Sequence, residues 1–125
     1  MDGQMKSVAI VGASRDPAKD SHKVSKYLKE RGYRIIPINP AATEILGEKC
    51  CPSLSAAPPA DIVDVFRPSS EVMAIAREAV ATKQKCGKPL VFWMQLGIEN
   101  EQARILLERE GIFVVENKCM MKENK

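Results

Sequence analysis

The 125-residue sequence has few of the residues that build metal centres or disulfide frameworks. It holds one histidine, His22, and four cysteines, none of which form a C-x-x-C pair. This excludes a zinc site of the usual ligand spacing, and we expect reduced thiols and no bound metal. Apolar runs of membrane-spanning length and a signal-like apolar segment are also lacking, which predicts a cytoplasmic protein with no membrane contact.

The two signs of charge are nearly balanced, with 19 Lys and Arg against 16 Asp and Glu and a formal net charge of +3. Such a mild excess suits a small polyanionic ligand. The sequence has no basic run with interleaved aromatic residues, so we expect no nucleic-acid partner. The length is that of one domain, and we expect residues 1–125 to fold as a single unit.

Short β-branched runs alternate with amphipathic helical patterns along the chain. The runs predict five strands, over residues 7–12, 33–39, 61–66, 88–96 and 112–116. The periodic segments between them predict helices within residues 21–32, 68–87 and 99–111. Either Ser69 or Ser70 is expected to cap the second helix, and either Glu99 or Asn100 the third. The alternation predicts an α/β fold: a doubly wound, parallel, five-stranded, Rossmann-like sheet with the strand order 3-2-1-4-5.

Prolines and charges shape the segments outside this pattern. Pro37 interrupts the second strand and predicts a position at or near a sheet edge, because proline lacks a ladder donor. Residues 40–60 are predicted to form a loop with one helical turn near residues 44–46. The tail, which mixes both signs of charge, is expected to fray.

Ligands of such a sheet bind beyond the C-terminal ends of the strands, where the strand order reverses. The predicted order puts this point between the first and fourth strands. Gly12 makes the turn from the first strand into the first helix, whose N–H groups and positive dipole end would face this crevice. Lys19, Lys23 and Arg67 lie near the same rim. The pattern favours a phosphate site, and the alternative is a tight glycine turn with solvated basic side chains.

A nicotinamide cofactor fits this pattern poorly. An NAD site needs an acidic residue at the end of the second strand to hold the ribose hydroxyls, and this chain has Asn39 followed by Pro40. Gly12 is also the only glycine of the turn, where the dinucleotide fingerprint has three. An NADP site would use a nearby Arg, and none follows Asn39 closely. An NAD(P)-dependent redox protein is therefore the weaker alternative.

Three segments carry a family resemblance: VGASRDPAKDSHKVSKYLKERGYRIIPINP, DIVDVFRPSSEV and VFWMQLGIENEQA. They resemble, in order, the small CoA-binding proteins, a family related to the N-terminal domain of the succinyl-CoA synthetase alpha subunit. The resemblance runs over residues 5–122. It implies a Rossmann-like fold that binds coenzyme A or acyl-CoA non-covalently at the switch point.

The resemblance also implies a set of ligand-binding residues. Backbone N–H groups of Gly12, Ala13 and Ser14 would meet the pyrophosphate, with Lys19 at the basic position of the motif. Ser21 would cap the first helix or touch phosphate. The synthetase has a lysine where this chain has Ala42, so that phosphate contact would either be absent here or come from Lys19, Lys23 or Arg67. Further along the ligand, Asn39 and Pro40 would flank the adenosine, Phe66, Arg67 and Pro68 would line the nucleotide crevice, and Met94 and Gln95 would border the pantetheine.

The sequence offers no catalytic constellation. His22 is expected at the exposed start of the first helix, Asp64 as a hydrogen-bonded group in a buried strand, and Glu99 as a helix cap or a group near the substrate. Cys119 is expected near the ligand, either forming a mixed disulfide with the CoA thiol or as a half-buried free thiol.

We therefore expect a non-catalytic module that binds coenzyme A or acyl-CoA. The alternative is an enzyme, or the partner subunit of an enzyme, that acts on acyl-CoA or a nucleotide. A homodimer through an exposed sheet edge is a further possibility.

Overall fold

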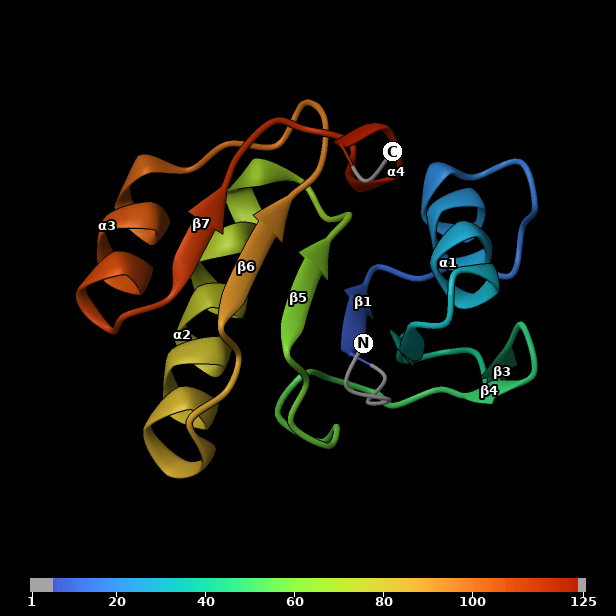
Figure 1. The fold of residues 1–125 in the computed structure, drawn as a ribbon, viewed down its shortest axis with the longest axis horizontal. Helices are drawn as coiled ribbons and strands as arrows, with labels where there is room; N and C mark the ends of the chain where they lie inside the picture. The colour runs from blue at the N-terminus through green and yellow to red at the C-terminus, as the bar shows by residue number, and fades with distance from the viewer. Residues whose placement is uncertain (1–5, 124–125) are drawn as a thin grey trace.

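The computed structural model describes residues 6–123 and contains a five-stranded parallel sheet. Its strands run in the order β2-β1-β5-β6-β7 (Figure 1). They are β1 (Ser7–Val11), β2 (Arg34–Ile38), β5 (Ile62–Val65), β6 (Val91–Met94) and β7 (Phe113–Val115). The predicted α/β, Rossmann-like class is confirmed, and each predicted strand contains an observed one.

The predicted strand order was wrong. Numbered as in the prediction, the observed order is 2-1-3-4-5, because β5 pairs with β1 and not with β2. Pro37 shows why. The N–H of Cys51 donates to the Pro37 carbonyl on the outer side of β2, at 2.9 Å. A strand residue directs its N–H and C=O to the same side, so a full strand paired there would lack a donor at Pro37, and β2 stays at the edge.

The chain returns from β2 to β5 through a hairpin where one helical turn was predicted. The hairpin pairs β3 (Glu44–Ile45) with β4 (Glu48–Lys49) in antiparallel fashion. Leu46 and Gly47 form its turn with φ values of +53° and +77°. Two consecutive left-handed residues are typical of the tight type I′ turn, which disfavours a helical turn at this point.

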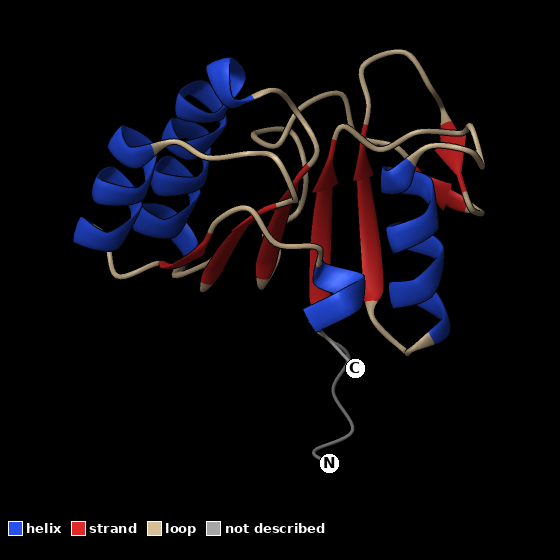
Figure 2. Cartoon of the chain, turned by 90° about the horizontal axis from the view of Figure 1, so that it is seen from above, coloured by secondary structure: helices blue, strands red, loops and turns tan. Residues whose placement is uncertain are grey.

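Helices cover both faces of the sheet, and those on one face contain more residues than those on the other (Figure 2). Helices α2 (Ser69–Cys86) and α3 (Glu101–Arg109) pack on one face, while α1 (Asp20–Glu30) and the short α4 (Met120–Glu123) pack on the other. An apolar layer lies on each face of the sheet, and successive strand residues point into opposite layers. Ala9 therefore packs on the side of α2 and Ile10 on the side of α1. The predicted helices are thus present, and part of the tail forms α4 where fraying was expected. Within residues 6–123, none of the helices has the length and apolar character needed to cross a membrane.

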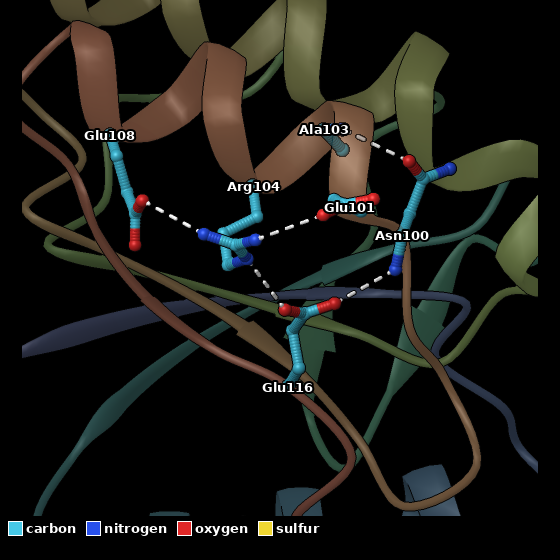
Figure 3. Close-up of polar contacts among 6 residues, drawn as sticks. All are labelled: Asn100, Glu101, Ala103, Arg104, Glu108 and Glu116. Carbon is cyan, nitrogen blue, oxygen red and sulfur yellow. Dashed lines mark hydrogen bonds and ion pairs between the residues drawn. The ribbon is translucent and has the colours of Figure 1, made fainter.

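Asn100, one of the two predicted alternatives, caps α3. Its side-chain oxygen accepts a hydrogen bond from the N–H of Ala103 at 2.9 Å. Glu116, directly after β7, accepts from the N–H of Asn100 at 2.9 Å and pairs with Arg104 at 3.1 Å (Figure 3). Arg104 also contacts Glu101 and Glu108 (Figure 3), so these polar contacts bind the first turns of α3 to the end of the sheet.

The predicted serine cap of α2 is not observed. Pro68 occupies the cap position and makes no side-chain hydrogen bond to the helix. The Ser69 hydroxyl instead accepts a hydrogen bond from the N–H of Glu99 at 3.0 Å, and Asn100 donates to the Ser69 carbonyl at 3.2 Å. Ser69 therefore links the start of α2 to the start of α3. The first N–H groups of α2 receive no hydrogen bond from the side chain of the N-cap residue.

Asn100→Ala is expected to lower the free energy of unfolding by about 1 to 2 kcal/mol, because it removes a helix cap. Glu99→Ala is the matched control, since it retains the backbone N–H that bonds Ser69 and should change stability by less than about 0.5 kcal/mol. Urea unfolding followed by circular dichroism measures both. Equal losses in the two variants would contradict the assignment of the cap.

Candidate functional site

A crevice of about 940 Å³ opens beyond the C-terminal ends of β1 and β5. These adjacent strands lead to helices on opposite faces of the sheet, β1 to α1 and β5 to α2 (Figure 1). The strand order therefore reverses between β1 and β5, and not between the first and fourth predicted strands. The volume is near the upper end of the range of about 300 to 1,000 Å³ for small-molecule sites.

Most of the predicted ligand-binding residues line this crevice. They are Gly12, Ala13, Ser14, Lys19, Ser21, Lys23, Asn39, Pro40, Phe66, Arg67, Gln95 and Cys119. Two do not. Met94 is fully buried in the apolar layer under α2 and α3, because it belongs to the set of alternate β6 residues that face those helices. Pro68 is outside the lining and stands directly before α2.

The turn after β1 needs a glycine at position 12 for two reasons. Gly12 has a φ of +91°, which L side chains rarely adopt. A Cβ at this position would also lie 3.0 Å from Cδ of Arg67 and 3.1 Å from the Phe66 carbonyl oxygen. The N–H groups of Gly12 and Ala13 both donate to the Ile38 carbonyl at 3.3 Å. These two amides, which the resemblance assigns to the pyrophosphate, thus bond the end of β2 in this structure.

The N-terminus of α1 also lies at the crevice. The helix begins at Asp20, and its N-cap residue, Lys19, makes no side-chain hydrogen bond to it. Ser21 is buried in the first turn and is not the cap. The first N–H groups of a helix have no intrahelical partner and carry the positive end of its dipole. Lys19 and Lys23 both line the crevice at this end, which therefore suits a phosphate or another anion.

Asn39 uses its side-chain amide to shape the loop after β2. Its nitrogen donates to the Ala13 carbonyl at 2.9 Å. Its oxygen accepts from the N–H groups of Ala41 and Ala42, at 2.7 and 2.9 Å. Asn39 thus joins this loop to the turn after β1, and the end of β2 presents no carboxylate to a ribose.

Arg67 is held by a carboxylate that the sequence reasoning did not single out. Its Nε and Nη2 atoms bond the two oxygens of Glu71 at 3.0 and 2.8 Å. The pair lowers the pKa of Glu71 and raises that of Arg67. Glu71, Ile75 and Glu78 line the crevice from one stripe of α2, at i, i+4 and i+7. This helical spacing is visible in the sequence and groups the three residues on one face of α2. The sequence alone does not show that this face lies toward the crevice.

Gln95 and the segment after Asn117 form the other wall. Met121 and Lys122 line the crevice beside Cys119, and both were missed because the tail was expected to fray. Gln95 is 4% exposed, and its side-chain oxygen accepts from the N–H of Met120 at 3.4 Å. These contacts set α4 against the sheet next to the crevice.

Asp64 lies at the centre of the sheet, behind this wall. It is fully buried, and one carboxyl oxygen accepts a 2.7 Å hydrogen bond from Gln95. Its other oxygen, Oδ2, has no partner among the described residues. Burial raises the pKa of Asp64 to about 8, and the hydrogen bond from Gln95 offsets part of that rise. Asp64 is outside the crevice lining, so it does not act on a ligand directly.

The described lining offers groups for binding more than for acid–base chemistry. It contains no histidine, and two of its carboxylates, Glu71 and Glu78, already bond Arg67 and Ser55. Within residues 6–123 no three His, Cys, Asp or Glu side chains gather closely enough to hold a metal ion.

The fold and crevice define a Rossmann-like α/β domain with a crevice at the point where the strand order reverses. A sequence model of the family described as CoA binding domain matches residues 6–125. The chain belongs to this CoA-binding domain family, as the sequence resemblance predicted.

Similar proteins include both small chains and a much larger enzyme. The uncharacterized protein YneT of Bacillus subtilis (strain 168) is 40% identical over 116 residues, which cover 92% of this chain and 82% of YneT. A solved structure from Thermus thermophilus, cell-free ID.343, has a TM-score of 0.86 at 38% identity, covering 96% of this chain and 88% of that one. The ADP-forming acetate–CoA ligase of Methanocaldococcus jannaschii is 37% identical over 85 residues, which are 66% of this chain and 11% of the ligase.

Gly12→Ala is expected to destabilise the protein more than Gly32→Ala does. The two glycines have nearly equal φ values, +91° and +93°, but a Cβ at Gly32 meets nothing within 4 Å. Gly32→Ala should therefore cost about 1 kcal/mol of backbone strain, and Gly12→Ala should cost about 1 kcal/mol or more beyond that, owing to the Phe66 carbonyl. Urea unfolding compares them, and equal costs would show that the close approach is unimportant.

Asp64→Asn is expected to stabilise the protein increasingly as the pH rises. The unfolded chain loses the Asp64 proton near the ordinary pKa of 3.8, whereas the folded protein keeps it until about pH 8. Between these values the wild type loses up to about 1.4 kcal/mol of stability per pH unit from this group, and the variant does not. Urea unfolding at pH 5, 6 and 7.5 gives the difference.

Asp61→Asn is the control for that series and should show no pH trend across it, because the stability that Asp61 contributes changes only in stronger acid. Although burial acts against it, hydrogen bonds from Ser7 and Lys88 hold the pKa of Asp61 below its ordinary value. Asp61 therefore contributes stability that is complete above its ordinary pKa of 3.8 and is lost only in stronger acid, so its removal should cost the same at pH 5, 6 and 7.5. A wild-type-like pH dependence in Asp64→Asn would contradict the assignment of a buried neutral acid.

Proposed function

We propose that the protein binds coenzyme A or acyl-CoA in the crevice and performs no chemistry on it. The observation that carries this is the uncapped N-terminus of α1, flanked by Lys19 and Lys23, in the crevice of a CoA-binding domain family member. Coenzyme A presents several phosphate charges, and such a helix end with two lysines suits them.

In this proposal the ligand lies across the point between β1 and β5 where the strand order reverses. The phosphates sit at α1, near Lys19 and Lys23. The adenosine extends toward Pro40 and Phe66, and the pantetheine toward Gln95 and Cys119. Support comes from the placement of all of these side chains along one continuous crevice. Arg67, which Glu71 already holds, is a weaker phosphate donor than the resemblance alone implies.

Two observations weigh against a nicotinamide cofactor and against an independent enzyme. The end of β2 carries Asn39, whose amide is engaged in its own loop, in place of the carboxylate that NAD requires. The described lining lacks a histidine, and its Glu71 and Glu78 are engaged in other contacts.

A role as the CoA-binding partner of an acyl-CoA enzyme is the second candidate. The similarity to 11% of an ADP-forming acetate–CoA ligase supports it, because in that protein a comparable segment belongs to a larger catalytic chain. Such a partner would bring the catalytic groups, while this chain would bring the crevice.

A ligand panel tests the proposed function. Thermal unfolding and calorimetric titration are run with CoA, acetyl-CoA, ATP, NAD and NADP. CoA at about one hundred times its Kd should add about 2.7 kcal/mol of stability, whereas NAD and NADP should add none. Stabilisation by NAD without stabilisation by CoA would overturn the proposal.

Lys19→Ala and Lys23→Ala are each expected to weaken CoA binding roughly tenfold, the effect of losing one charge-assisted contact to phosphate. Lys26→Ala is the matched control, because it removes the same charge from an exposed position of α1 outside the crevice lining. Calorimetric titration at constant salt compares the three. Equal losses for all three would indicate a general charge effect in place of a phosphate site at the helix end.

A further inference from the structure

The buried carboxyl of Asp64 has no evident structural compensation. It sits on β5 among apolar neighbours, with Ile10 beside it on β1 and Trp93 on β6. Its Oδ2 atom is the one buried side-chain polar atom in residues 6–123 that lacks a hydrogen-bond partner. A buried carboxylate without a cation is very unfavourable, so the group is stable here only while it is protonated.

A short chain of hydrogen bonds links Asp64 to Met120, at the start of α4. The side chain of Gln95 donates to Asp64 at 2.7 Å and accepts from the N–H of Met120 at 3.4 Å. A second contact runs beside it, since the indole N–H of Trp93 donates to the Lys118 carbonyl at 2.7 Å. Met120 itself is 4% exposed and packs into the same apolar layer as Ile10.

The segment that these bonds hold is a wall of the crevice. We call residues 118–123 the tail segment. Its Cys119, Met121 and Lys122 line the crevice, while Met120 faces the sheet. Movement of the tail segment away from the sheet would therefore open the crevice and bring water to the sheet face around Asp64.

We propose that neutral Asp64 is a positioning residue that, through Gln95, holds the tail segment against the sheet, and that ionisation of Asp64 releases this wall of the crevice. The charge that forms on ionisation needs water. The α4 helix of the tail segment is the shortest helix on that face, and the tail segment is the element bonded to Gln95, so its departure would admit water beside Asp64. Crevice closure thus depends on one proton at the centre of the sheet.

No charged group of the described residues lies where it could stabilise an ionised Asp64 in place of water. The strands β1, β5 and β6 contain no other ionisable residue. The ionisable groups that pack on or border this face come from α1, the link from α1 to β2, the hairpin region and the tail segment: Tyr27, Tyr33, Cys50, Lys118, Cys119, Lys122 and Glu123. Burial and the Gln95 hydrogen bond are the influences that act on Asp64, with no contribution from any of these groups.

Trp93 provides a test that needs no ligand, because it is the single tryptophan of the chain and bonds the tail segment directly. The fluorescence of the full chain is titrated from pH 6 to 10. The wild type should show a red shift with a midpoint near pH 8, where Asp64 ionises. Far-UV circular dichroism should change little across it, because only a short segment is released. Asp64→Asn should show no such shift.

Two further variants make this test decisive. Cys119→Ser keeps Asp64 and should retain the wild-type midpoint, which separates Asp64 from the nearby thiol. Gln95→Leu breaks the link at every pH and should already show the red-shifted emission at pH 7. A transition that persists in Asp64→Asn, or that is missing from the wild type, would overturn the proposal.

The ligand arm of the test rests on the proposed function. If binding needs the docked tail segment, the affinity of the wild type for CoA should fall roughly tenfold between pH 7 and 9, since about one molecule in ten keeps Asp64 protonated one unit above the midpoint. Asp64→Asn should lose much less affinity over this range. Equal losses in both would overturn the link to the crevice. If CoA binds at no pH while the Trp93 transition occurs, the proposed function fails and the role of Asp64 stands.

Discussion

The pairing of β1 with β5 is the contact on which the site depends. From these two neighbouring strands the chain leaves toward opposite faces, into α1 and into α2, and the crevice opens between the two helix starts. The strand ends approach so closely that the Phe66 carbonyl would lie 3.1 Å from a Cβ at position 12. A glycine there makes the approach possible. Every other feature of the crevice is arranged around this reversal.

Charge is distributed unevenly around the crevice. At the start of α2, Glu71 neutralises Arg67 and also faces the positive end of the helix dipole. At the start of α1, two lysines accompany one first-turn carboxylate, Asp20. Positive potential is therefore greatest at α1. In the proposed function, this unevenness would orient an anionic ligand in a protein whose overall charge is only +3.

The family occurs both as small proteins and as a segment of much larger ligases, to judge from the relatives of this chain. A crevice that supplies helix N–H groups and lysines, with its glutamates engaged in internal contacts, is compatible with both settings. In the proposed function it would hold a ligand by itself or hold it for a partner that performs the reaction. The buried Asp64 adds a second property, because a carboxyl group kept neutral in an apolar layer makes the neighbouring wall sensitive to one proton.

Local sequence patterns determined the elements. β-branched runs predicted the positions of the five strands, helical periods predicted the three long helices, and the Gly12 turn with its following lysines predicted residues that line the crevice. Tertiary structure alone decided the strand order, the exclusion of Met94 from the crevice, the use of the Gly12 and Ala13 amides by Ile38, and the partners of Arg67 and Asp64. The reason is physical. Periodicity and turn chemistry act between residues a few positions apart, whereas each of these outcomes depends on which strand ends and loops meet in space, and many arrangements of the same elements satisfy the local rules equally well.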